Sequence, residues 1–314
     1  MHEQLTLRSA KFKVQYICVM AVPPFQRARN RGYYGLDKAT EGEWNGPFSF
    51  IQGADIQFGM IAKFVPEEAK RGWQKEIELT RTAVAAVNKM KPRPRFFIVC
   101  GDLVHAFPGT KNREEQEKDF KKEFKDLDSE IPLVCVCGNH DIGNTPTRQT
   151  VANYVDKFGD DYFSFWVGGV KFIVLNSQFY EDPSQVMELK EKQDQWLDEQ
   201  LAEDSKCKHM VIFQHTPWFL KNPEEKHLKN LNMENDLRLR MLEKFRNAGV
   251  RAIFCGHYHR NGGGFYGNME EVITCAMGYT KAQSGLRVVR VYENTIKHGM
   301  DDIPETLCLS EAST

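Results

Sequence analysis

The stretch Val134-Cys135-Val136-Cys137-Gly138-Asn139-His140-Asp141 decides the fold, because an apolar run stops at a glycine and then delivers three polar side chains. Such a run predicts a buried strand with Asn139, His140 and Asp141 at its carboxyl end. An amide oxygen can bind a metal, an imidazole can move a proton and a carboxylate can orient the imidazole. Asn and Asp also favour solvated turns, so this stretch alone fits a surface turn equally well. The rest of the chain decides between the two interpretations.

Two earlier strands end in the same way. Residues 48–52 lead into Gly53-Ala54-Asp55, and the apolar run 96–100 leads into Gly101-Asp102. In a largely parallel sheet the carboxyl ends of the strands meet at one edge, where ligands bind. We therefore expect Asp55, Asp102 and Asn139 to converge.

Strand and helix patterns alternate along the rest of the chain. Predicted helices are one that opens at Pro66 and those over residues 113–128, 147–158, 187–202 and 235–248; further predicted strands cover 162–166, 170–176, 210–215, 252–255, 270–276 and 286–292. This alternation predicts an α/β fold with a largely parallel sheet and helical crossovers. The turn Gly168-Gly169 predicts a hairpin that opens a second sheet.

Two of the later strands also end in polar side chains. His215 closes the strand 210–215, and Gly256-His257-Tyr258-His259 follows the strand 252–255. One histidine at a strand end is usually an ordinary turn residue, but five polar strand ends are difficult to explain as turns. We expect all five at the same sheet edge. The charged loop 216–233 lies beside them, and loops of this length are usually functional or disordered.

Composition limits the class of protein. The chain has 314 residues, of which 41% are hydrophobic and 27% charged, with a formal net charge of -1. This length supports a sizeable core, and the near-neutral charge argues against a nucleic-acid or membrane-surface binder. No apolar run reaches the roughly 18 residues that span a bilayer. We divide the chain into an N-terminal arm (1–46), one α/β domain (47–300) and an acidic tail (301–314).

The cysteines indicate an intracellular protein. Four of the eight lie in apolar strand-like runs, where a free cysteine behaves as a small buried hydrophobe: Cys100, Cys135, Cys137 and Cys255. Structural disulfides of a secreted chain are expected in loops instead. Residues 14–22 are only vaguely like a signal peptide, because Gln15 interrupts the apolar run and no clean cleavage site follows.

The side chains at the five strand ends suit a metal centre. Carboxylates, an amide oxygen and imidazoles are borderline-to-hard donors, and no thiolate is among them. This donor set predicts two divalent cations such as Mn, Fe or Zn. Two metals roughly 3.5–4 Å apart activate a bridging water and clamp both oxygens of an in-line phosphoryl displacement.

These motifs, in this order, resemble the calcineurin-like metallophosphoesterase superfamily over about residues 48–290. They are Asp55-x-Gln57, Gly101-Asp102, Gly138-Asn139-His140-Asp141, His215 and Gly256-His257-Tyr258-His259. The resemblance implies a four-layer α/β/β/α sandwich with a mixed, largely parallel core sheet. It also implies hydrolysis of phosphomonoesters by direct attack of a metal-bridging hydroxide. The residues around the motifs, such as 143–147 and 159–166, are similar to a cytoplasmic serine/threonine-protein phosphatase of the family, which implies a phosphoprotein substrate and a cytoplasmic location.

The resemblance further implies a role for each motif residue. The metal ligands would be Asp102 for both metals, Asp55 and His259 for the first, and Asn139, His215 and His257 for the second. His140 would donate a proton to the leaving oxygen or stabilise its charge. Asp141 would orient His140 through the other ring nitrogen.

Two positions depart from the family pattern. Gln57 stands where the family has histidine, and a neutral amide oxygen is a weaker donor, so the first metal is expected to be loosely held or to be a harder ion such as Mn or Mg. His105 stands where a carboxylate is common, and a protonated His105 could contact the substrate phosphate. Arg260, directly after the last motif, could grip phosphate bidentately or could be an ordinary surface residue.

Two other functions remain open from the sequence. A phosphodiesterase acting on nucleotides or lipids would use the same ligands. A non-catalytic scaffold that retains the fold is favoured by Gln57 and opposed by the intact ligand set of the second metal.

Overall fold

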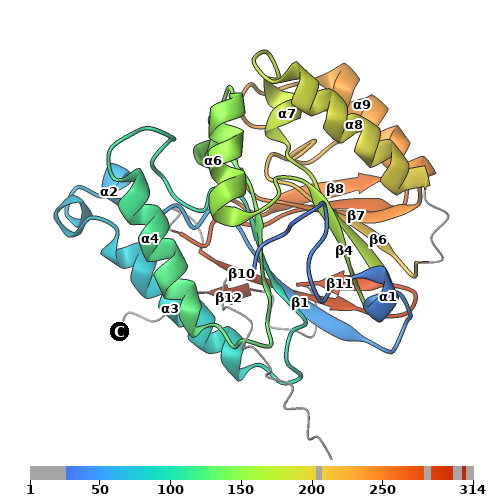
Figure 1. Cartoon of the computed structure of the whole chain (residues 1–314), viewed down its shortest axis with the longest axis horizontal. Coiled ribbons are helices and arrows are strands. Elements are labelled where there is room, and N and C mark those ends of the chain that lie inside the picture. Colours follow the sequence, from blue (N-terminus) through green and yellow to red (C-terminus); the bar gives the residue numbers. More distant parts are fainter. Residues whose placement is uncertain (1–25, 203–206, 279–283, 300–305, 309–314) are drawn as a thin grey trace, which may run out of the picture.

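The computed structural model describes residues 26–202, 207–278, 284–299 and 306–308, and in these ranges two stacked sheets are enclosed by helices (Figure 1). The signal-like stretch 14–22 and most of the predicted acidic tail lie outside the described residues.

The first sheet has the strand order β11-β10-β1-β2-β3, with β12 paired to β10. Its strands are β1 (Phe48–Gly53), β2 (Phe97–Cys100), β3 (Leu133–Val136), β10 (Gly285–Val291), β11 (Ile296–His298) and β12 (Thr306–Cys308). The strands β1, β2 and β3 are parallel, with Val99 of β2 opposite Cys135 of β3. Their carboxyl ends therefore open at one edge, as predicted for Asp55, Asp102 and Asn139.

The second sheet has the strand order β4-β5-β6-β7-β9-β8. Its strands are β4 (Phe163–Val167), β5 (Val170–Val174), β6 (Met210–Phe213), β7 (Val250–Cys255), β8 (Gly262–Tyr266) and β9 (Met269–Ile273). The predicted hairpin at Gly168-Gly169 is confirmed, and it does open this sheet. The prediction that all five polar strand ends share one sheet edge is wrong, because β6 and β7 belong to the second sheet.

Helices cover the outer face of each sheet. They are α1 (Lys38–Glu41), α2 (Ile61–Phe64), α3 (Gln74–Lys89), α4 (Arg113–Glu123), α5 (Asn139–Ile142), α6 (Arg148–Phe158), α7 (Gln178–Glu181), α8 (Met187–Ala202) and α9 (Asn235–Asn247), with 3-10 turns at Glu68–Arg71 and Phe124–Asp126. Figure 1 shows α3 and α4 on one side of the sandwich and α8 and α9 on the other. The predicted helix after Pro66 begins later than expected, since a 3-10 turn ending at Gly72 precedes α3.

Three apolar layers hold this arrangement together. Ile77 of α3 and Phe120 of α4 pack on the first sheet, whereas Leu197 of α8 and Leu242 of α9 pack on the second. Between the sheets lies a third cluster of buried aromatic side chains: Phe50, Phe96, Phe165, Phe172, Phe213 and Phe254. Each fully buried side chain of this size contributes roughly 1.5–3 kcal/mol. The fold is therefore the four-layer α/β/β/α sandwich with two mixed sheets, in each of which the strands that carry the polar ends are parallel.

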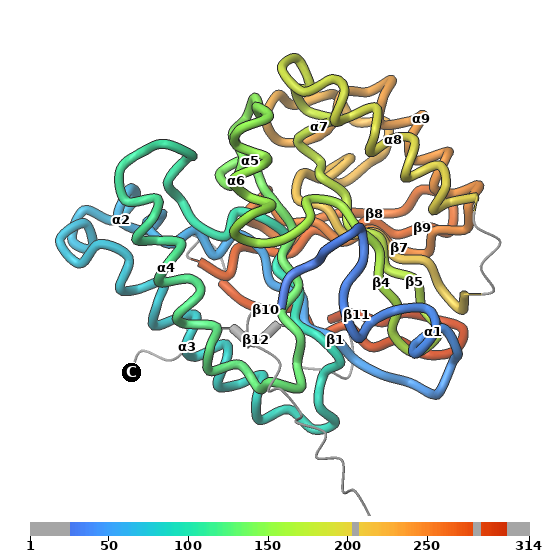
Figure 2. The backbone as a smooth tube through the Cα atoms, viewed as in Figure 1, coloured from blue at the N-terminus to red at the C-terminus, as the bar shows by residue number. Residues whose placement is uncertain are grey.

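Residues 26–46 pack against the second sheet. The backbone N–H of Trp166 donates to Leu36 at 2.9 Å, and that of Ser164 donates to Arg31 at 3.1 Å. Figure 2 shows this segment, in blue, running beside β4. Ala28, Tyr33 and Leu36 are buried by the packing.

Within the described ranges, no helix combines the length and apolar character needed to cross a bilayer. The four cysteines predicted to be buried and free have both properties.

Candidate metal centre

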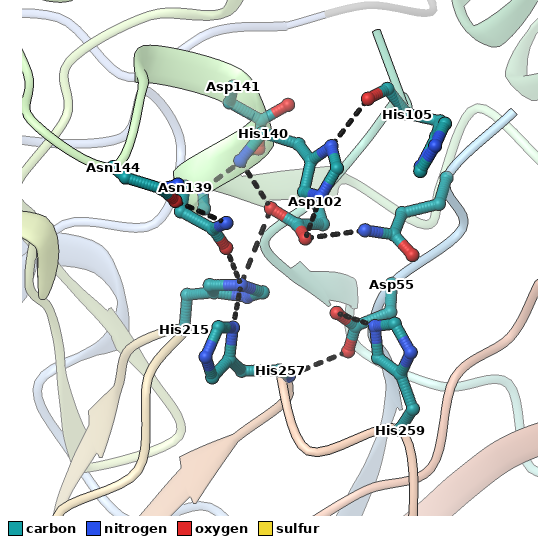
Figure 3. Close-up of polar contacts among 12 residues, drawn as sticks. Asp55, Asp102, His105, Asn139, His140, Asp141, Asn144, His215, His257 and His259 are labelled. Carbon is teal, nitrogen blue, oxygen red and sulfur yellow. Dashed lines mark hydrogen bonds and ion pairs between the residues drawn. The ribbon is translucent and has the colours of Figure 1, made fainter. Parts of the chain in front are cut away.

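The polar ends of five strands meet where the two sheets abut (Figure 3). Asp55 follows β1, Asp102 follows β2 and Asn139 follows β3, while His215 and His257 follow β6 and β7 of the second sheet. Two groups of possible metal ligands result, in each of which the ligand atoms lie within 4.8 Å of one another: Asp102 with His215 and His257, and Asp55 with Asp102 and His259. Asp102 is common to both groups.

The backbone is strained at these positions. Five residues at the strand ends have positive φ angles between 43° and 68°: Asp55, Gln57, Asp102, His257 and His259. Each such residue costs roughly 1–3 kcal/mol unless the surroundings enforce it, and this strain is typical of functional sites.

Glycine allows the close approach of two ligands. A Cβ atom on Gly138 would lie 2.3 Å from Oδ1 of Asp102, and one on Gly101 would lie 2.2 Å from Nδ1 of His215. No side chain fits at either position. Gly101 and Gly138, which follow two of the predicted strands, are therefore requirements of the site.

Three possible ligand atoms crowd around Nε2 of His215. Nδ1 of His257 lies 3.0 Å away, Oδ1 of Asn139 lies 3.1 Å away and Oδ1 of Asp102 lies 3.3 Å away. The other polar atom of each of three side chains has its own partner. Nδ2 of Asn139 donates to Asn144, Nδ1 of His215 contacts the carbonyl of Cys100, and Nε2 of His257 contacts the carbonyl of Asn230, each at 2.8 Å.

These outer partners assign the protons. A carbonyl oxygen only accepts, so neutral His215 carries its proton on Nδ1 and neutral His257 carries its proton on Nε2. The two ring nitrogens that face each other then both present lone pairs, as do the facing oxygens of Asn139 and Asp102. With both rings neutral, four acceptors face one another and form a site for a cation; imidazole, carboxylate and amide oxygen suit a divalent metal.

The charges of the site show that a proton on His215 competes with a metal for this position. Burial disfavours protonation of His215, but Asp102 and Asp55 outweigh this effect and raise its pKa to about 10. Burial and the neighbouring His215 lower the pKa of His257 to about 4. The pKa of Asp102 is lowered despite burial, because His215 and His140 lie beside it. The buried carboxylates therefore stabilise a positive charge at this position.

The first-metal side is less completely bonded. Nε2 of His259 lies 3.2 Å from Oδ1 of Asp55, and the backbone N–H of His257 donates to Oδ2 of Asp55 at 2.8 Å. Gln57 is buried and donates its amide N–H to Oδ2 of Asp102 at 2.6 Å. Oδ1 of Asp55 and Oε1 of Gln57 are buried atoms without a hydrogen-bond partner among the described residues. Oε1 of Gln57, which has no partner among the described residues, and Oδ1 of Asp55, whose one close polar contact there is His259, also fit a cation.

His140 is held differently from the prediction. Its Nδ1 contacts the carbonyl of His105, and its ring stacks on His105 and packs against Phe107, with ring centroids at 4.8 and 4.2 Å. Its Nε2 faces the centre, 3.9 Å from Oδ2 of Asp102. The predicted contact between Asp141 and the second ring nitrogen of His140 is wrong, because a main-chain carbonyl occupies that nitrogen.

Asp141 instead organises the backbone under the site. Its buried carboxylate accepts from the N–H of Gly138 at 2.8 Å and of Leu103 at 3.1 Å. Arg113, also buried, donates to the carbonyls of His140 at 2.7 Å and Asp141 at 3.1 Å. These contacts fix the loops that carry Asp102 and Asn139.

The two predicted substrate contacts differ in their surroundings. Burial and the neighbouring His140 lower the pKa of His105 to about 4, so this ring is neutral near pH 7 and does not supply the positive charge predicted for it. Arg260 is exposed, directly after His259.

Sequence reasoning missed the groups that orient the ligands. These are the carbonyls of Cys100, His105 and Asn230 and the side chains of Arg113 and Asn144. A main-chain carbonyl leaves no signal in a sequence. Asn144 could have been found, since it lies one short turn after the Asn139 motif.

A cavity of about 570 Å³ adjoins the second-metal side. Asn139, Asn144, Glu181, Lys229 and His257 are among its lining residues. Its walls come from the charged loop 216–233, from α7 and from the segment after α5. This volume lies within the range of roughly 300–1,000 Å³ that is typical of ligand sites.

Comparison with known proteins identifies relatives of the chain. A family model described as calcineurin-like phosphoesterase matches residues 54–261. The chain is 48% identical over 291 residues to the Homo sapiens protein named serine/threonine-protein phosphatase CPPED1, which covers 90% of this chain and 93% of that protein. The Danio rerio protein of the same name is 45% identical over 291 residues, covering 90% and 94%.

Solved structures share the fold at lower identity. A dimetal phosphatase from Danio rerio superimposes with a TM-score of 0.57 at 17% identity, covering 81% of this chain and 96% of that one. GAP50, the anchor in the inner membrane complex of Plasmodium, gives a TM-score of 0.57 at 13% identity, covering 85% and 86%.

Proposed function

The chain belongs to the calcineurin-like phosphoesterase family, and on this premise we propose that it is a two-metal phosphatase acting on phosphoserine and phosphothreonine in proteins. The observation that carries the proposal is the meeting of Asn139, His215, His257 and Asp102 around a point whose donor atoms suit a divalent cation. Complete ligation of this kind has little use in a scaffold.

The proposed ligands divide into two positions that share Asp102. The second metal position comprises Asn139, His215 and His257, and the first comprises Asp55, His259 and Gln57, the last through its orphaned Oε1. When bound, two divalent cations such as Mn, Fe, Zn or Mg would activate a water and withdraw charge from the phosphoryl oxygens.

His140 is the proposed acid of the reaction. Because Nδ1 contacts the carbonyl of His105, Nε2 is the atom free to carry a proton to the leaving serine or threonine oxygen. Stacking on His105 and Phe107 fixes the ring, so proton delivery needs no reorientation. Asp141 and Arg113 are proposed to act through the backbone that carries His140.

Protein substrates are supported by the named relatives and by the shape of the site. The CPPED1 relatives match over nearly their whole length, and the cavity beside Asn139 has room for residues that flank a phosphoserine. Arg260 is a proposed phosphate contact at the opposite, first-metal side. We further propose a cytoplasmic location, which the buried free cysteines support.

The proposal is tested with purified protein and three substrates: a mono-aryl phosphate, a bis-aryl phosphate and a phosphoserine peptide. We expect metal-dependent hydrolysis of the monoester and the peptide, with Asn139→Ala inactive. Preference for the bis-aryl substrate would indicate a phosphodiesterase instead. Full activity in excess chelator would overturn the proposal.

A further inference from the structure

The ring of His257 is oriented by a loop far away in the sequence. Its Nε2 lies 2.8 Å from the carbonyl of Asn230, and this contact leaves Nδ1 facing His215. The carbonyl therefore selects both the tautomer and the direction of the lone pair. Asn230 itself is exposed and has a φ of 62°, in the left-handed region.

The turn that presents this carbonyl is closed by Asn232. Its Oδ1 accepts from the N–H of Leu228 at 2.6 Å, and its Nδ2 donates to Oε1 of Glu225 at 2.6 Å and to the carbonyl of Lys226 at 3.2 Å. Asn232 is 0% exposed. A buried amide with its donor and acceptor both engaged holds a loop in one conformation.

Two charged side chains anchor the loop to the domain. The carboxylate of Glu225 accepts the N–H groups of Leu220, Lys221 and Asn222 at 2.6, 3.0 and 3.2 Å. Arg238 of α9, 0% exposed, donates to the carbonyls of Glu225 and Met233 and to Oδ1 of Asn235. The loop therefore has a buried framework even though residues 227–231 are exposed.

We propose that residues 225–232 form a positioning loop, whose Asn230 carbonyl fixes the ring of His257 and thereby sets the affinity of the second metal position. The inference rests on the proposed metal centre. It assigns a role to a segment that would act on the metal only through His257. Because Lys229 and Asn230 also line the adjoining cavity, the same loop forms a wall of the proposed substrate site.

Substitution of Asn230 tests the loop without removing a buried group. Asn230→Gly keeps the left-handed backbone and the carbonyl, whereas a β-branched valine strongly disfavours a positive φ. Asn230→Val should raise the Kd of the second metal position for Mn²⁺ by about ten-fold. This is the lower end of the loss in metal affinity expected when the hydrogen-bond partner of a ligand is removed. Asn230→Gly should restore it, and Asn230→Ala should lie between, which keeps the test open if the valine variant does not fold.

The readout is Mn²⁺ binding to the metal-free protein, measured as the Kd of each site, together with the melting temperature in chelator. A wild type with two sites and a selective loss in Asn230→Val supports the proposal. Equal Kd values in the valine and glycine variants would overturn the loop's role while leaving the metal centre intact. A wild type that binds no Mn²⁺ would overturn the metal centre itself, and the loop proposal with it.

Discussion

The second half of the metal centre, formed by Asn139, His215 and His257, differs from the first half in how each side chain is held. Each of the three has a partner at 2.8 Å on the atom that points away from the centre. In the first half, one oxygen each of Asp55 and Gln57 is buried without a hydrogen-bond partner among the described residues. Burial does not separate the two halves, since Asp55 and Gln57 of the first are as deeply buried as His215 of the second.

The difference suggests an order of affinity. A ligand that is already oriented loses little conformational freedom when it binds, so a preorganised site binds more tightly. The second position should therefore fill before the first. Gln57 adds to the contrast, because an amide oxygen is a weaker donor than imidazole.

Asp102→Asn should have the largest effect, because Asp102 is common to both halves. The amide removes a negative charge while keeping nearly the same shape, so we expect loss of both metals and roughly a thousand-fold fall in kcat on a mono-aryl phosphate. Metal content and rate are measured on the same sample, with circular dichroism as the control for folding. Retention of either metal at wild-type affinity would contradict the shared role.

His140→Asn should lower kcat without altering the difference in metal affinity between the two halves. The backbone N–H of residue 140, which donates to Asp102 at 2.9 Å, is retained in the variant. We expect about a hundred-fold lower kcat, as for loss of a general acid, and unchanged Kd values for both metals. A large change in metal affinity would show that His140 acts on the metal centre rather than on the leaving group.

Gln57→His should reduce the difference in metal affinity between the two halves. Imidazole at this position supplies a stronger donor, so the Kd of the first metal should fall on the order of ten-fold. The measurement is a Mn²⁺ titration, with Gln57→Leu as the matched control that supplies no donor. Equal Kd values in the histidine and leucine variants would exclude Gln57 as a ligand.

Arg260→Ala should have the smallest effect and should act on the substrate alone. An exposed arginine that grips phosphate contributes to binding, so KM should rise by a few-fold while both metal Kd values stay constant. Arg260→Lys keeps the charge but not the bidentate geometry, and it should fall between wild type and alanine. Unchanged KM in both variants would remove Arg260 from the site.

The sequence was sufficient to predict which polar side chains meet at the candidate metal centre, and the family resemblance implied the layers. Asn139, His215 and His257 follow apolar runs directly, and such runs leave few places for a polar side chain except the open end of a strand. It predicted a second sheet but did not assign β6 and β7 to it, because strands such as β2 and β6 are buried on both faces and look alike whichever sheet contains them.

Two details of the site were beyond the sequence for physical reasons. Adjacent side chains on a helix point in different directions, so His140 and Asp141 at the start of α5 do not face each other. The partners that orient His140 and His257 are main-chain carbonyls, which every residue has. Their positions depend on how distant loops pack, and no residue type encodes that.

The most direct test of the account is a Mn²⁺ titration of the metal-free wild type, Asn139→Ala and His259→Ala, which remove one ligand from each half. The account predicts two classes of site in the wild type, with the tighter class lost in Asn139→Ala and the weaker class lost in His259→Ala. Loss of the tighter class in His259→Ala, or two identical sites in the wild type, would contradict it.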